Sequence, residues 1–276
     1  MDLQGKVVVI TGGGRGIGRE IALGCAKQGA RLVVAARSEG DLAETKKAVQ
    51  PYDSEVLTVP CDVSKPDQVA TLFEKARQRG PVYGLVCAAA IHGPIGPFSE
   101  LDPDLFRQVL DINVMGTVLC AQAALSDMKK KGGRMVFFSG GGEKAFPRFS
   151  AYVASKGAIW RLTETLGAEL KEQGIFVNAI APGAVNTRLL QNVLDAGPEK
   201  AGADNYQAGL QQAQEGGVSP EKAVKLVTYL LSEKSKGLTG KIISAVWDPY
   251  ESWTDLEKIS SSDYLSMRRL KMPSSS

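Results

Sequence analysis

The sequence predicts an α/β fold in which helices flank both faces of a doubly wound, parallel β-sheet. Short runs rich in Val and Ile alternate with amphipathic stretches along the chain, which is typical of βαβ units. Some of these runs, such as Val7–Ile10, are apolar at every position, as expected of strands that are covered on both faces. Because βαβ crossovers are almost always right-handed, such units favour a doubly wound sheet.

The first part of the chain contains four predicted strands, each followed by a helix. The predicted strands are Lys6–Ile10, Arg31–Ala35, Val56–Val59 and Val82–Ala88, and the predicted helices are Gly18–Gln28, Asp41–Val49, Pro66–Gln78 and Pro103–Lys130. Gly29 ends the first of these helices, because glycine readily adopts the left-handed conformation that follows a helix. Pro51 limits the second, since the residue before a proline disfavours helical geometry.

The rest of the chain continues the alternation, with two exceptions. Its predicted elements are the strands Arg134–Phe138, Phe176–Ile180 and Lys241–Val246 and the helices Ser150–Gln173 and Pro220–Leu231. No linker divides residues 1–246, so we expect a single domain there. Residues 184–218 are rich in Gly, Ala and Gln with a weak helical pattern, which predicts a mobile lid. Residues 247–276 form a C-terminal extension, whose last residues we expect to be disordered.

Composition and charge argue against several classes of function. The 276 residues are 43% hydrophobic and 23% charged, and a net charge of +3 gives no sign of a nucleic-acid partner. The sequence contains no run of about eighteen apolar residues, the length that a membrane-spanning helix needs. The cysteines Cys25, Cys61, Cys87 and Cys120 are scattered and form no metal-binding motif. Together with an N-terminus unlike a secretory signal, they predict a cytoplasmic protein with reduced thiols and no bound metal.

A glycine-rich turn with the sequence TGGGRGIG, residues 11–18, joins the first predicted strand to the first helix. Glycines let the backbone approach an anion closely, and a helix N-terminus presents unpaired N–H groups to it. The turn therefore predicts a pyrophosphate cradle. The candidate cofactor-binding residues in it are Gly12, Arg15, Gly16, Ile17 and Gly18. Its spacing is not GxGxxG, so an ordinary strand–helix turn is the alternative.

The end of the second strand bears on the choice of dinucleotide. An acidic residue there would bind a ribose 2′-hydroxyl, whereas Arg37 offers a guanidinium to a 2′-phosphate. Ser38 follows it, and Arg15 could supply a second cation, so the sequence favours NADP over NAD as the cofactor. Glu39 could still serve a ribose, which leaves NAD open, and Arg37 could also be an ordinary solvated strand end.

Tyr152 and Lys156 are four residues apart at the start of a predicted helix, so their side chains share one face. An ammonium about 5 Å from a phenol, at an effective dielectric near 20, favours the phenolate by roughly 3 kcal/mol. The pKa of Tyr152 should then fall by about two, which makes it a candidate general acid/base. Ser139 ends a strand, where doubly wound sheets bind ligands, and could hydrogen-bond the same substrate oxygen. Without such context, a Tyr-xxx-Lys pair is usually a surface helix pair.

These motifs, in this order, resemble those of the short-chain dehydrogenase/reductase family, of the type with one Rossmann-like domain. The resemblance covers about residues 1–246. The glycine turn resembles the family's TGxxxGxG loop, and Ser139, Tyr152 and Lys156 match its catalytic trio in spacing. Asn113 resembles the Asn of the family's long fourth helix.

The resemblance implies further contacts and a mechanism. The additional cofactor-binding residues that it implies are Asp62, Val63, Ala89, Pro182, Gly183, Val185 and Thr187, together with Tyr152 and Lys156. Tyr152 would exchange a proton with the substrate oxygen, which Ser139 would orient. Lys156 would lower the tyrosine pKa and bind the nicotinamide ribose, and Asn113 would connect Lys156 to solvent through its backbone and a water.

Two departures from the family pattern qualify this comparison. The sequence CAAA at 87–90 replaces the family's usual Asn-Asn-Ala-Gly, so we expect weaker support for the cofactor, with backbone contacts retained. Trp247 and Tyr250 are bulky residues in a segment where most family members have small side chains. In the family the long helices, here 103–130 and 150–173, form a four-helix dimer face, which implies a homodimer or homotetramer.

The sequence therefore predicts an NADP-dependent oxidoreductase that interconverts a ketone and a secondary alcohol of a polar small molecule, with sugar- or cyclitol-like compounds as one option. The alternatives are a β-ketoacyl thioester reductase and a catalytically silent, NADP-binding sensor. His92 is expected to be an ordinary loop residue, with a place at the substrate mouth as the alternative. Glu143 and Lys144 could contact a hydroxylated substrate.

Overall fold

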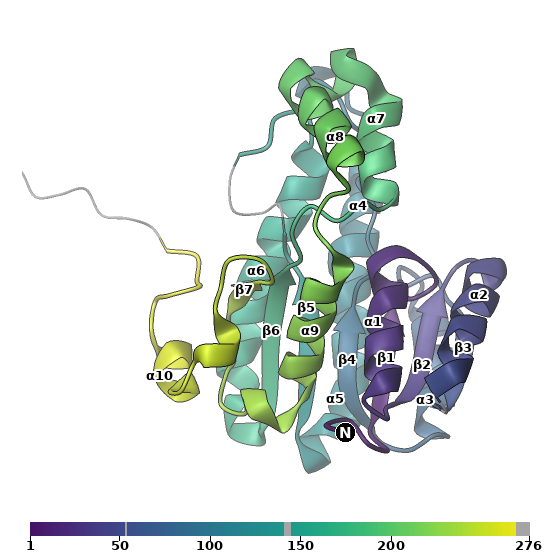
Figure 1. Ribbon diagram of the computed structural model, residues 1–276, viewed down its shortest axis with the longest axis vertical. Coiled ribbons are helices and arrows are strands. Elements are labelled where there is room, and N and C mark those ends of the chain that lie inside the picture. The colour runs from purple at the N-terminus through teal and green to yellow at the C-terminus, as the bar shows by residue number, and fades with distance from the viewer. Residues whose placement is uncertain (53, 141–144, 269–276) are drawn as a thin grey trace, which may run out of the picture.

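The computed structural model describes residues 1–52, 54–140 and 145–268 of the chain (Figure 1). In that part of the chain, seven strands form one sheet in the order β3-β2-β1-β4-β5-β6-β7. The strands are β1 Val7–Thr11, β2 Arg31–Ala36, β3 Val56–Pro60, β4 Val82–Cys87, β5 Gly133–Phe138, β6 Ile175–Ala181 and β7 Ile242–Ser244. Every neighbouring pair is parallel. The predicted fold class is confirmed.

Helices connect the strands and cover both faces of the sheet (Figure 1). They are α1 Gly16–Lys27, α2 Glu39–Val49, α3 Pro66–Arg77, α4 Pro103–Leu110, α5 Gly116–Lys131, α6 Ser150–Leu170, α7 Arg188–Ala201, α8 Ala203–Glu215, α9 Pro220–Leu231 and α10 Leu256–Ser261. Short 3₁₀ turns lie at Gln50–Tyr52, Phe98–Glu100, Lys171–Gln173, Glu233–Ser235 and Tyr250–Ser252. The ends of most predicted elements differ from these by no more than a few residues.

Strand β1 is apolar from Val7 to Ile10 because both faces of the sheet are buried there. Val7 and Val9 of β1 pack in the cluster formed with α3, α5 and α6. Val8 and Ile10 of the same strand pack in the cluster formed with α1, α2 and α9. Successive side chains of a strand point to opposite faces, so two helical layers require a continuous apolar run.

The predicted helix Pro103–Lys130 is interrupted. A π-helical turn, Asp111–Met115, separates α4 from α5. Such turns are rare and occur frequently at functional sites. This one carries Asn113, whose side chain accepts the N–H of Ile91 and donates to its carbonyl, at 2.9 and 3.0 Å. The π-helical turn therefore carries the side chain that hydrogen-bonds the backbone of the loop after β4.

The segment Pro103–Lys131 is long and apolar enough to cross a membrane by length and composition alone. In the fold, however, α5 packs on the sheet, and its Ala121, Ala124 and Met128 belong to the buried core. Core helices of globular domains have the same composition.

Residues 184–218 are more regular than the sequence predicts, because they form the helices α7 and α8. The two helices lie together at one end of the molecule, beyond the sheet (Figure 1). Gly202, with a φ of 85°, separates them, and α7 is kinked at Gly197. Val193 and Ala201 are the buried side chains of α7, and they pack against Phe149. Since so few side chains are buried, the helical pattern in the sequence is weak.

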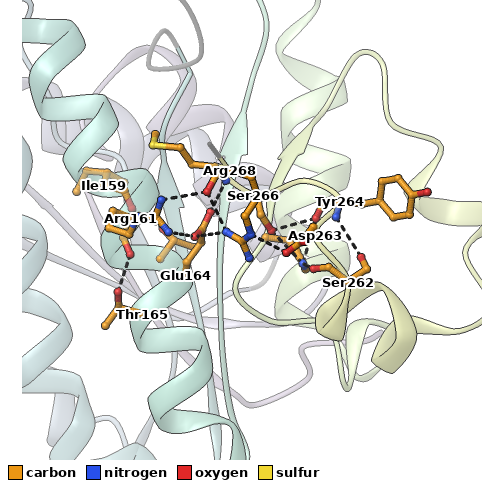
Figure 2. A network of polar contacts seen from close by, with 12 residues as sticks. Ile159, Arg161, Glu164, Thr165, Ser262, Asp263, Tyr264, Ser266 and Arg268 are labelled. Atoms are coloured by element: carbon orange, nitrogen blue, oxygen red, sulfur yellow. Dashed lines mark hydrogen bonds and ion pairs between the residues drawn. The ribbon is translucent and has the colours of Figure 1, made fainter. Parts of the chain in front are cut away.

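The described part of the C-terminal extension is attached to the domain by polar contacts. The buried Lys241 ammonium donates to the carbonyl of Ser262 at 2.6 Å. Glu164 of α6 pairs with Arg268 at 3.0 Å (Figure 2). The disorder expected for the last residues falls on 269–276, which lie outside the described residues.

Candidate functional site

The glycine-rich turn between β1 and α1 forms one wall of a cavity of about 540 Å³. Gly12 has a φ of 68°, and a Cβ atom there would lie 2.6 Å from the backbone nitrogen of Ala89. Only glycine allows this close approach of the two strand ends. The cavity is lined by the predicted cofactor residues Gly12, Arg15, Gly16, Ile17, Gly18, Arg37, Ser38, Asp62, Val63, Ala89 and Thr187.

Two residues that the sequence analysis missed keep the turn in shape. The buried hydroxyl of Thr45 donates to the carbonyl of Gly13 at 3.0 Å. Arg19 donates through Nε to the carbonyl of Gly14, also at 3.0 Å. These bonds hold the carbonyls of the turn away from the cavity, and the α1 N-terminus supplies N–H groups of the kind that bind a phosphate. The cavity therefore fits a dinucleotide pyrophosphate.

Positive charge gathers at the end of β2. Arg37 and Arg15 both line the cavity, and Arg15 lies 3.9 Å from the carboxylate of Asp41, an exposed pair of little strength. Ser38 caps α2 by accepting the N–H of Asp41 at 3.2 Å, which leaves its hydroxyl hydrogen for another acceptor. Burial raises the pKa of Asp62, but hydrogen bonds within its own loop and the charge of Arg37 outweigh it and hold that pKa below its usual value. The field of Arg37 thus extends over this part of the cavity.

The strand end where the sequence departs from the family pattern keeps its place beside the glycine turn. Ala88 donates its N–H to the carbonyl of Thr11 at 3.2 Å, and Ala88, Ala89 and Ala90 all line the cavity. Cys87 is buried. The replacement therefore removes polar side chains while the backbone remains close to the cavity, and the weaker support expected for the cofactor stays a prediction.

Tyr152 and Lys156 lie together near the start of α6, as predicted. The Lys156 ammonium is 5.4 Å from the centre of the phenol ring. The Tyr152 hydroxyl donates to the carbonyl of Gly140 at 3.4 Å, and Lys156 donates to the carbonyl of Phe138 at 2.8 Å. Both partners follow or end β5, so the pair stands at the carboxyl edge of the sheet.

Asn113 joins this pair to the rest of the site. Besides its two bonds to Ile91, its amide donates to the hydroxyl of Ser155 at 3.0 Å. Ser155 stands next to Lys156 in α6, so Asn113 connects the loop after β4 to the helix that carries Tyr152. Its predicted link to Lys156 through the backbone and a water stays a prediction.

The predicted fall in the pKa of Tyr152 is wrong for this structure. Burial raises the pKa of Tyr152 to about 12 and lowers the pKa of Lys156 to about 8. In both cases loss of hydration disfavours the charged form. The Coulomb estimate from the sequence contained the attraction between the two groups but not the burial of either.

Ser139 has a different partner from the one expected. It is fully buried, and its hydroxyl donates to the carbonyl of Lys156 at 2.9 Å. The next residue, Gly140, presents its carbonyl to Tyr152, and a Cβ atom on it would lie 3.1 Å from Cδ of Pro182. The contact between Ser139 and a substrate oxygen stays a prediction, and it requires this hydroxyl to leave Lys156.

The loop after β6 reaches toward the glycine turn. Gly183 has a φ of 83°, and Thr187 caps α7 by accepting the N–H of Leu189 at 3.3 Å. Val185 and Thr187 line a second cavity of about 400 Å³ beside Gly16, whereas Pro182 and Gly183 line neither cavity. The structure therefore brings the later residues of this loop, but not the first two, to a cavity wall.

His92 is closer to the candidate catalytic residues than expected. It is buried, with its ring centre 4.6 Å from that of Tyr152 and 5.6 Å from that of Phe149. His92 lies in the loop after β4, as expected, and packs against the candidate acid/base, while its place at the substrate mouth stays a prediction. The sequence signal for this location was the position of His92 shortly after the predicted strand Val82–Ala88. Glu143 and Lys144, also considered as site residues, lie outside the described residues.

Comparison with known proteins agrees with this geometry. The family model described as short chain dehydrogenase matches residues 6–197. A trihydroxynaphthalene reductase from Colletotrichum orbiculare is 29% identical over 87% of this chain and 88% of its own length. An NADPH-dependent aldehyde reductase 2 (chloroplastic) from Arabidopsis thaliana is 31% identical over 88% of this chain and 93% of its own. The crystal structure of an NAD⁺-bound xylitol dehydrogenase superposes with a TM-score of 0.82, 27% identity, and coverage of 88% of this chain and 98% of that one.

The doubly wound sheet, the glycine turn and the Tyr–Lys pair define a dinucleotide-binding oxidoreductase domain. The chain belongs to the short-chain dehydrogenase family, and it is an oxidoreductase that acts between CH–OH and C=O groups.

Proposed function

We propose that the protein uses NADP and interconverts a ketone and a secondary alcohol of a small polar molecule. The observation that carries this proposal is the arrangement at one edge of the sheet. The Tyr152–Lys156 pair stands at the end of β5, and the glycine-turn cavity opens at the ends of β1 and β4. Ligands of doubly wound sheets bind at this edge.

Each residue has a task in the proposed reaction. Tyr152 exchanges a proton with the substrate oxygen. Lys156 places a positive charge within reach of the phenol and binds ribose hydroxyls, and Asn113 fixes α6 against the loop after β4. The nicotinamide dinucleotide, when bound, supplies or accepts the hydride.

The preference for NADP rests on charge. Arg37 and Arg15 line the part of the cavity at the end of β2, and a guanidinium matches a phosphate dianion better than a ribose hydroxyl. The Arabidopsis relative is named as NADPH-dependent, while the xylitol dehydrogenase structure is titled as NAD⁺-bound. The relatives thus use both dinucleotides, and the two arginines favour the phosphorylated one.

The test is a pair of fluorescence titrations with NADPH and NADH, followed by turnover over a panel of ketones and an acetoacetyl thioester. We expect tighter binding of NADPH and oxidation of NADPH that depends on Tyr152. No binding of either dinucleotide at micromolar concentrations would refute the proposal. Turnover confined to the thioester would instead indicate a β-ketoacyl reductase.

A catalytically silent sensor is the second candidate, favoured by the engaged Ser139 hydroxyl and by the polar side chains missing at 87–90. Such a protein binds NADPH but oxidises it with no carbonyl compound. Tyr152→Phe would then leave both dinucleotide binding and partner binding unchanged. Turnover by the wild type that is absent from this variant excludes the sensor.

We further propose a homodimer or homotetramer, formed across the helical stretches 103–130 and 150–173. The Leu105 and Met115 side chains, on α4 and the π-helical turn, are 46% and 47% exposed. Light scattering measures the mass in solution, and a monomer at all concentrations contradicts this proposal.

A further inference from the structure

Strand β7 is the last strand of the sheet, so one of its edges faces away from β6. Successive residues of a strand direct their N–H groups to opposite edges. Ala245, just after β7, donates to the carbonyl of Ala181 of β6 at 2.9 Å, so Ile242 and Ser244 direct their N–H groups outward. Unpaired N–H and C=O groups along such an edge are a template for pairing with another chain.

Both outward N–H groups of β7 already have acceptors, and both acceptors belong to the C-terminal extension. Ile242 donates to the carbonyl of Leu265 at 3.1 Å, and Ser244 donates to the carboxylate of Asp248 at 2.7 Å. Leu265 has a φ of 57°, in the left-handed region that is unfavourable for residues other than glycine. Such a conformation persists only where the surrounding structure fixes it, so the extension has a defined position on the edge.

Buried groups hold residues 256–268, which we name the C-terminal strap, on this edge. Lys241 is 2% exposed, and its ammonium donates to the carbonyls of Ser262 and Tyr264 at 2.6 and 3.0 Å. The hydroxyl of Ser260 accepts the N–H of Thr239 at 2.9 Å. Apolar side chains of the strap pack on the core cluster that α9 covers, namely Leu256, Ile259 and Leu265. Because a buried ammonium needs these carbonyls, the strap and the start of β7 stabilise each other.

The far end of the strap is fixed to α6 (Figure 2). The side chain of Glu164 is 10% exposed, and its carboxylate accepts the N–H of Met267 at 2.5 Å and the guanidinium of Arg268 at 3.0 Å. Arg161, one turn earlier in α6, donates to the carbonyl of Met267 at 3.0 Å. Arg268 also pairs with Asp263 of the strap at 2.6 Å. The strap is therefore attached at both ends, to β7 and to α6.

We propose that the C-terminal strap caps the outer edge of β7 against a second copy of this chain. A two-fold axis at a bare edge brings two copies of one strand together, and each offers the groups that the other needs. The strap occupies that place, so copies associate only through the helical stretches 103–130 and 150–173. The proposal rests on the homodimer or homotetramer proposed above, which it narrows to a homodimer, and it is independent of the reaction.

The test compares the full chain with a deletion that ends at residue 255, which removes the strap and keeps Asp248. Light scattering over a wide range of protein concentrations should give the mass of a dimer for the full chain and of a tetramer for the deletion. A deletion that stays a dimer at every concentration, or a full chain that is already a tetramer, would overturn the proposal. A monomeric full chain contradicts association through the helices, whereas a dimer formed on deletion then still supports the cap.

Hydrogen exchange separates edge pairing from unspecific association of the apolar surface that the deletion exposes. Exchange at the Ile242 amide should be slow in the full chain at every protein concentration, because Leu265 accepts its hydrogen. In the deletion it should be slow where the tetramer forms and fast in dilute solution. Association of the deletion without this protection of Ile242 contradicts the proposal.

A point substitution keeps the proposal testable if the deletion does not fold. Glu164→Lys removes the acceptor of Met267 and Arg268 and leaves every apolar side chain in place. Glu169→Lys makes the same charge change at an exposed position of α6, where no bond to the described part of the strap is found. We expect tetramers of Glu164→Lys at high concentration, with faster exchange at Ile242 in dilute solution, and dimers of Glu169→Lys throughout. Equal behaviour of the two variants overturns the proposal.

Discussion

Replacement of Lys156 by Met should make the protein more stable while it abolishes turnover. Burial lowers the pKa of Lys156 to about 8, from 10.5 for a free lysine. At about 1.4 kcal/mol for each pH unit between the two values, keeping the ammonium in the fold costs roughly 3 kcal/mol at pH 7. Met has a similar length and no charge. It also leaves the carbonyl of Phe138 without its donor, which costs about 1 kcal/mol or more. We therefore expect a net gain of about 1–2 kcal/mol at pH 7.

The pH dependence identifies the cause of this gain. A lysine whose pKa is depressed by folding destabilises the fold fully below that lowered pKa, and the cost disappears as the pH rises toward the unfolded value. The advantage of Lys156→Met over the wild type should therefore be constant below pH 8 and shrink between pH 8 and 10.5. Urea unfolding of both proteins at a fixed protein concentration, from pH 6 to 10, measures it.

A second buried lysine provides the control. The ammonium of Lys241 has three partners, the carbonyls of Ser262 and Tyr264 and the hydroxyl of Ser266. Burial also lowers the pKa of Lys241, but Lys241→Met removes three hydrogen bonds where Lys156→Met removes one, so it should destabilise the protein at pH 7. A Lys156→Met protein that is less stable than the wild type at pH 7, or an advantage that does not change with pH, would refute the reasoning.

Three further substitutions test the site. Tyr152→Phe should lower kcat by about 10²–10⁴-fold with unchanged NADPH affinity, because it removes only the exchangeable proton; retained turnover would argue against the acid/base role. Arg37→Glu should weaken NADPH binding at least tenfold in fluorescence titrations and favour NADH, and unchanged NADPH affinity would place the 2′-phosphate elsewhere. Gly12→Ala should cost about 2–4 kcal/mol in urea unfolding and abolish dinucleotide binding, because its Cβ would lie 2.6 Å from the Ala89 nitrogen at a φ of 68°. Gly157→Ala is its control: apart from its chain neighbours and the backbone of its own helix, no described atom lies within 4 Å of the added carbon, and a helix-interior Ala should add about 1 kcal/mol.

The parts of the site that the sequence predicts well are those set by neighbours in the chain. The turn at 11–18 is specified by its own glycines, and helical spacing places Lys156 beside Tyr152 whatever surrounds them. The strands are recognisable for a similar reason, since burial on two faces favours apolar runs such as Val7–Ile10.

Contacts between distant segments were not predictable in the same way. The partner of Ser139 is a carbonyl seventeen residues away on α6, and Thr45 reaches a carbonyl thirty-two residues earlier in the chain. No spacing rule links such pairs, because they depend on how layers of the fold pack together. The helices α7 and α8 were underestimated since few of their side chains are buried.

The pKa of Tyr152 shows most directly what the spacing of residues along the chain cannot predict. Helical spacing correctly predicts a nearby ammonium, and the attraction estimated from it is roughly 3 kcal/mol. Burial outweighs this attraction, and the ring of His92, which packs against the phenol, contributes to that burial. His92 comes from the loop after β4, and the same burial lowers the pKa of Lys156 and so weakens the charge that was to stabilise the phenolate. The spacing therefore predicts which groups meet, whereas their protonation depends on what the fold packs around them.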